Sequence, residues 1–202
     1  ITTLNTFSIT AVVFPLLFLL MYLYLSLEKQ GVSVLFLLLF FVLTLIHYAG
    51  VLFLIAWVVY LILLKLEDMS PTAAEIEIGL CCLFLFLWTN LLIYKDAFLQ
   101  HGIDVIWQNI PLPIFSAYFP DITLVSALYY IGLIPLLYGV YAVFYHTFYT
   151  KNKNIYFLMA FTLATAFLLW LKLIKIELGL ISLGIIMSVL FSEFYLHIFQ
   201  RT

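Results

Sequence analysis

Long runs without a charged residue alternate along this chain with short clusters of charged and polar residues. The main charge-free runs are residues 1–27, 30–64, 78–94, 122–150, 154–171 and 178–192. A bilayer core about 30 Å thick is crossed by roughly 20 apolar helical residues, which rise about 1.5 Å each. Most of the charge-free runs reach that length when the uncharged or weakly charged residues beside them are included. The pattern therefore predicts an all-α, polytopic membrane protein with six or seven transmembrane helices.

The first half of the chain predicts a helix over about 7–27, bent at Pro15, followed by a polar turn at 28–31. The run 31–64 is too long for one crossing, because a single helix would measure about 50 Å. The break available is His47-Tyr48-Ala49-Gly50. Two short helices meeting there are favoured over the alternative, one long tilted helix.

A polar loop at 65–72 precedes the next predicted helix, over about 74–94. Thr72 and Glu75 have the spacing of a capping box, in which each side chain bonds the other residue's backbone N–H. Residues 95–121 combine charges, aromatic residues and three prolines. This composition indicates a segment lying along the membrane interface, with a short helix around 103–109.

The next helix is expected from Asp121 to about 146, with a bend where Gly132, Pro135 and Gly139 fall close together. Residues 155–200 form either a hairpin turning at 172–177 or one helix with charges in its middle, and the cost of buried charge favours the hairpin. The predicted division is a five-helix core over 1–146 and an additional C-terminal hairpin over 147–202.

Composition supports a membrane protein and indicates where it is made. Apolar residues make up 67% of the chain and charged residues 9%, whereas soluble domains carry about 25% charge. The net charge of −2 excludes a basic nucleic-acid footprint. Phe and Tyr are abundant and Arg201 is the only arginine, a bias typical of AT-rich codon families. Together with a hydrophobicity that hinders import, this bias predicts translation in an organelle and a multi-pass protein of the mitochondrial inner membrane.

The chain offers little chemistry of its own. Cys81 and Cys82 are adjacent, so on a helix they point about 100° apart and cannot grip one metal ion. The four histidines do not give the paired axial ligands of a membrane di-haem protein. We therefore predict no catalytic residue, metal or cofactor. Glu193 is a candidate for function, because carboxylates inside membranes are costly; the alternative is a span-end residue that reaches water.

Several segments resemble chain 6 of mitochondrial NADH:ubiquinone oxidoreductase, complex I. The segment 30–36, Gln-Gly-Val-Ser-Val-Leu-Phe, resembles the start of that family's second span. The segment 48–54, Tyr-Ala-Gly-Val-Leu-Phe-Leu, is similar to its third, and a competing register places the family's tyrosine at Tyr60. The segments 107–109, 115–118 and 124–128 are similar to the region before and within its last span.

The resemblance implies a non-catalytic core subunit of the membrane arm, without a redox centre, that couples ubiquinone reduction to proton translocation. Its partners would be lipids and the other membrane subunits. The family's third span contains a π-bulge thought to gate a water path. The resulting proton-path candidates are Tyr48, Gly50, Tyr60 and, from its position in an apolar run, Glu193. For Gly50, the alternative role is a tight turn between two helices.

Three other readings remain open. Trp170, Lys172 and Glu177, with the segment 184–193, resemble parts of cytochrome c oxidase chain 3. The chain is also compatible with a lineage-specific structural subunit of a respiratory complex. A stand-alone transporter is the last of the three, and the lack of an internal motif repeat disfavours it.

Overall fold

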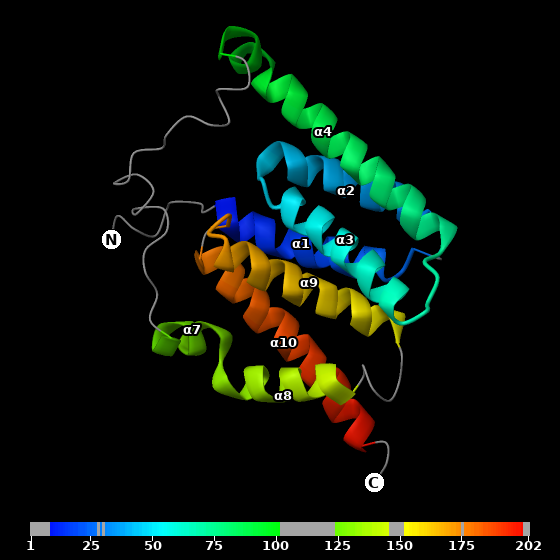
Figure 1. Cartoon of the computed structure of the whole chain (residues 1–202), viewed down its shortest axis with the longest axis vertical. Coiled ribbons are helices and arrows are strands. Elements are labelled where there is room, and N and C mark those ends of the chain that lie inside the picture. The colour runs from blue at the N-terminus through cyan, green and yellow to red at the C-terminus, as the bar shows by residue number, and fades with distance from the viewer. Residues whose placement is uncertain are drawn as a thin grey trace. The chain divides into compact units, whose positions relative to one another are not determined.

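The computed structural model describes residues 9–27, 29, 31–101, 124–145, 152–174 and 176–199. These residues form eight α-helices and no strand, which confirms the predicted all-α class for the described part of the chain (Figure 1). The helices are α1 (Ile9–Tyr24), α2 (Val32–Ile46), α3 (Gly50–Leu66), α4 (Ala73–His101), α7 (Leu124–Ile131), α8 (Leu133–Tyr145), α9 (Lys153–Trp170) and α10 (Ile176–Phe199).

The helices gather into two compact units. One unit comprises Ile1–Leu54 with Pro71–Asn109, and the other comprises Ile55–Ser70 with Ile110–Thr202. Helix α3 therefore contributes its first residues to one unit and the remainder to the other. The sequence-based division at residue 146 stays a prediction.

In the first unit, the break expected within 31–64 is confirmed. Helix α2 ends at Ile46, His47 has an extended backbone (φ −155°), and α3 begins at Gly50. The polar turn before α2 ends at Gly31, whose φ of +82° lies in the left-handed region that glycine adopts readily. Two helices of about 22 Å and 25 Å thus replace one of about 50 Å.

An aromatic cluster of Tyr24, Phe36, Phe40 and Phe53 forms the core of the first unit. The Phe53 ring from α3 lies 5.3 Å from the Phe36 ring and 5.6 Å from the rings of Tyr24 and Phe40, measured between centroids. All four residues are buried. Aromatic rings at these separations and tilts add favourable contacts beyond burial alone, so the cluster joins α1, α2 and the start of α3.

Helix α4 begins with the predicted capping box. The Thr72 N–H donates to the Glu75 carboxylate at 2.6 Å, and the Glu75 N–H donates to the Thr72 hydroxyl at 3.3 Å. Where the helix ends was predicted wrongly, since α4 continues through 95–101 to His101. No proline or glycine lies between the predicted end at Tyr94 and Gly102, and Lys95 and Asp96 are tolerated in an exposed helix. The short helix expected around 103–109 lies outside the described residues.

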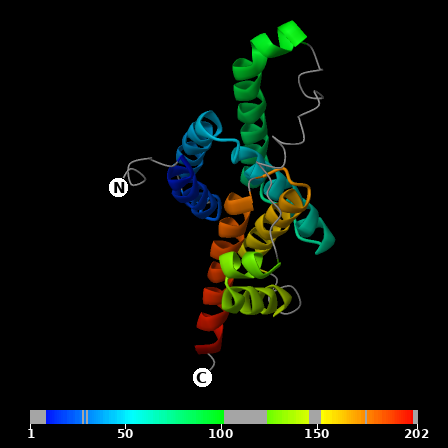
Figure 2. The same cartoon turned by 90° about the vertical axis from the view of Figure 1, so that its left-hand side faces the viewer.

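In the second unit, the expected bend is a complete break. Gly132 separates α7 from α8 with a φ of +85°, and Pro135 follows three residues later. The predicted C-terminal hairpin is confirmed, because α9 and α10 are separate helices joined by a turn and packed together. In both views α7 and α8 lie beside α10 (Figures 1 and 2).

Two helical segments among the described residues are long and apolar enough to cross a bilayer, Ala73–Asp96 and Lys153–Trp170. Five further apolar segments are shorter, namely Val12–Tyr24, Val32–Ile46, Gly50–Leu66, Leu133–Tyr145 and Leu178–Ser192.

Candidate functional site

Two of the sequence-derived candidates, Tyr48 and Gly50, lie in the turn between α2 and α3. The Tyr48 ring stacks on the His47 ring, with centroids 4.1 Å apart and planes 29° from parallel. The Ala49 N–H donates to His47 Nδ1 at 3.0 Å, which fixes the imidazole in the turn. Tyr48 is exposed, whereas Gly50 is buried. The turn thus places an aromatic pair on the surface and a glycine inside.

Gly50 allows a close approach between neighbouring helices. A Cβ added to it would lie 2.9 Å from Thr44 Cγ2 in α2 and 3.5 Å from Phe86 Cδ2 in α4. The residue is the first of α3, and α3 is α-helical from Gly50 to Leu66. A glycine at the start of a helix differs from the bulge within a span that the resemblance implies. Close packing at a turn is the role that the contacts of Gly50 indicate, and its gating role stays a prediction.

The alternative tyrosine, Tyr60, lies ten residues after Gly50 in α3, which is about 15 Å along the helix axis. It is buried, with 1% of its surface exposed. Its ring meets the Phe157 ring of α9 edge-on, at 5.6 Å and 88°. Tyr60 is therefore part of the packed interface between α3 and α9.

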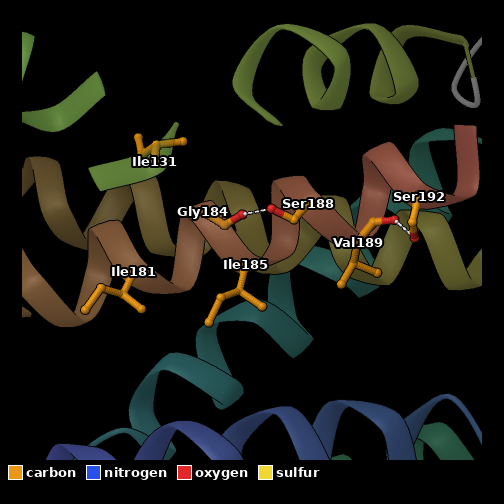
Figure 3. A pocket seen from close by; sticks show the side chains of 7 residues that line it. All are labelled: Ile131, Ile181, Gly184, Ile185, Ser188, Val189 and Ser192. Carbon is orange, nitrogen blue, oxygen red and sulfur yellow. Dashed lines mark hydrogen bonds between the residues drawn. The ribbon is translucent and has the colours of Figure 1, made fainter. Parts of the chain in front are cut away.

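Glu193 lies on α10, and its side chain is outside the described residues. The residue directly before it, Ser192, lines a groove along α10 (Figure 3). The groove has a volume of about 450 Å³. Its lining residues are Ile131 from α7 and Ile181, Gly184, Ile185, Ser188, Val189 and Ser192 from α10.

The chemistry of this groove is that of an apolar surface with two hydroxyls. The Ser188 hydroxyl donates to the Gly184 carbonyl and the Ser192 hydroxyl to the Val189 carbonyl, both at 2.8 Å (Figure 3). These donors are satisfied within the helix, and the lining residues include no ionisable group. The groove thus suits an apolar chain or a helix better than a reacting substrate.

A polar clamp holds the N-terminal end of α9 against the turn after α3. The Lys153 ammonium donates to the Ser70 carbonyl at 2.8 Å, and the side chains of Tyr156 and Glu67 are hydrogen-bonded. The Asn152 side chain caps α9 by accepting from the Asn154 N–H at 3.0 Å. The capping asparagine is visible in the sequence. The clamp cannot be seen in the sequence, because Lys153 and Ser70 are 83 residues apart.

No group of three or more His, Cys, Asp or Glu side chains within the described residues is placed to hold a metal ion. Cys81 is exposed and Cys82 is buried, so the two thiols face different surroundings, as their helical spacing predicts.

These observations define the class of the described residues: they form apolar α-helices with large aliphatic and aromatic side chains exposed on their surface. No protein-family model, curated protein or solved structure matches the chain.

Proposed function

We propose that this chain is a multi-pass protein of the mitochondrial inner membrane that works as a packed, non-catalytic subunit of a respiratory complex. Helix α4 carries the membrane part of the proposal. Ala73–Asp96 is apolar and measures about 36 Å, yet only 22% of its most apolar stretch is buried. An apolar helix normally hides its side chains in a soluble protein. Lipid or partner helices are the surroundings in which this exposure is favourable.

The hydroxyl groups of the helices support the same proposal. The Thr89 hydroxyl donates to the Leu85 carbonyl and the Thr165 hydroxyl to the Phe161 carbonyl, both at 2.7 Å. Both threonines are buried. Bonding back to the preceding helical turn satisfies a donor without water, as a hydrocarbon environment requires. The exposed Ser188 and Ser192 follow the same pattern.

Complex I is the proposed assembly, and chain 6 the proposed position. The support comes from the resembling segments 30–36, 48–54 and 124–128, together with their order. The helix break at 47–49 falls at the start of the second segment, and the third segment begins α7. In this role the chain contributes helices to the membrane arm and assists coupling of quinone reduction to proton movement. Gly50 lies at the start of a helix, whereas the family has its π-bulge within the third span. The proposed gate of the water path would therefore lie in the turn between α2 and α3.

Two experiments test this proposal in sequence. Alkaline carbonate extraction of mitochondrial membranes should leave the chain in the pellet, since apolar helices inserted in lipid resist it. Mild solubilisation and a native gel, followed by mass spectrometry of the bands, should then place it with NADH dehydrogenase activity. Release by carbonate would contradict the membrane proposal. Migration with cytochrome c oxidase would instead support the second resemblance, through Trp170, Lys172 and Glu177.

A further inference from the structure

We infer that α7 and α8 are the two halves of one membrane crossing, hinged at Gly132, and that α7 is its movable half. The inference rests on the proposed membrane location. Neither helix crosses alone, because α7 measures about 12 Å and α8 about 20 Å. End to end they measure about 32 Å, close to the thickness of the hydrocarbon core.

The polar clamp supplies the argument for a crossing. Because Lys153 bonds the Ser70 carbonyl, the start of α9 and the turn before α4 lie at the same membrane face. Helix α4 leaves from that face and is long enough to reach the other one. The chain must return before Asn152. The only charge-free run of spanning length between α4 and α9 is 122–150, which contains α7 and α8.

Gly132 is the point at which this crossing can bend. Its φ of +85° is strained for other residues, and an added Cβ would meet Pro135 at 3.2 Å. In transport proteins, broken helices inside the membrane often line the site around which the moving parts rock. The break lies next to the groove on α10, since Ile131 lines that groove (Figure 3).

The two halves make different contacts with α10. Helix α8 is seated closely, because a Cβ on Gly139 would lie 3.3 Å from the Met187 backbone Cα, and the Tyr138 and Phe191 rings are 5.1 Å apart. Helix α7 contacts α10 but leaves 77% of Val125 and 86% of Tyr129 exposed. Motion about Gly132 would therefore swing α7 and open or close the groove at its Ile131 side.

The crossing is tested with single cysteines in reconstituted, sided vesicles, on a background that carries Cys81→Ser and Cys82→Ala. The reporters are the exposed positions Ser70→Cys, Asn154→Cys and Gln100→Cys. A membrane-impermeant maleimide should label the first two from one side and Gln100→Cys from the other. Labelling of Ser70→Cys and Asn154→Cys from opposite sides, or of all three from one side, would overturn the crossing. Failure of carbonate resistance would instead remove the membrane location itself.

The hinge is tested on the same background with pairs of spin labels and pulsed electron resonance. One pair, Tyr129→Cys with Ser188→Cys, joins α7 to α10, and its control, Tyr141→Cys with Ser192→Cys, joins α8 to α10. All four side chains are exposed, so the labels disturb little packing. The α7 pair should show a distance distribution at least twofold broader than the α8 pair. Equal widths would overturn the assignment of α7 as the movable half.

Discussion

Replacing Gly179 by alanine gives a sharp test of how α9 and α10 pack. Gly179 is buried on α10, directly against Leu169 of α9. A Cβ added there would lie 2.5 Å from Leu169 Cγ and 2.8 Å from Cδ1, with Cδ2 also in contact. All three contacts are to one side chain, which must move or be shortened.

The expected energies follow from two opposing effects. Forcing a methyl group into a packed interface costs about 1–3 kcal/mol. Alanine in place of glycine also stabilises the helix by up to about 1 kcal/mol, because alanine has the higher helix propensity. Gly179→Ala should therefore destabilise the protein by about 1 kcal/mol. Once Leu169→Ala has removed the opposing side chain, the same Gly179→Ala change should stabilise it by up to about 1 kcal/mol.

The measurement is a double-mutant cycle, with unfolding in mixed detergent micelles followed by circular dichroism as the denaturing detergent is increased. The coupling between the two changes should reach about 2 kcal/mol. The control pairs Gly179→Ala with Leu163→Ala, an exposed leucine on the same helix as Leu169, and should be additive to within about 0.5 kcal/mol. If Gly179→Ala destabilises the unaltered protein and the Leu169→Ala variant equally, the proposed packing is refuted.

Three further predictions concern single positions and use the same unfolding assay. Gly132→Ala should cost about 1–2 kcal/mol because of its left-handed backbone, and a loss no larger than that of Val140→Ala would contradict the hinge geometry. Thr72→Val should cost about 1 kcal/mol by removing the N-terminal cap of α4, whereas Glu75→Gln retains both capping bonds and should cost less; equal losses would argue against the box. Tyr156→Phe should cost about 1 kcal/mol through the lost bond to Glu67, and an unchanged stability would show that the bond contributes nothing.

Local features of the fold were predictable where one stretch of sequence determines them. Thr72 and Glu75 predict the capping box by their spacing alone. Gly132, Pro135 and Gly139 predict a bend in the region where the structure has the break between α7 and α8. The length of 31–64 requires a division, and His47–Gly50 is the weakest helical stretch within it. In each case the backbone conformation that the local sequence favours is also the one found in the folded structure.

Features that depend on distant segments were not predictable. Nothing near Gly139 indicates that Met187 lies against it, and Lys153 and Ser70 give no sign of their bond. The end of α4 was placed too early because Lys95 and Asp96 suggest a loop, although an exposed helix accepts both. For the candidate site, the sequence indicated Gly50 and Tyr60 but not their surroundings, Thr44 and Phe157.

The central claim is that lipid surrounds the apolar helices, and the native Cys81 on α4 tests it most directly. Cys81 is exposed and Cys82 is buried, so a spin label attached in mild detergent should modify Cys81 selectively. After reconstitution, collisions of the label with oxygen should be frequent and collisions with a water-soluble nickel chelate rare, because oxygen concentrates in hydrocarbon. A label on Gln100→Cys in a Cys81→Ser background should show the reverse. Nickel collisions at Cys81 as frequent as at Gln100→Cys would place α4 in water and contradict the account.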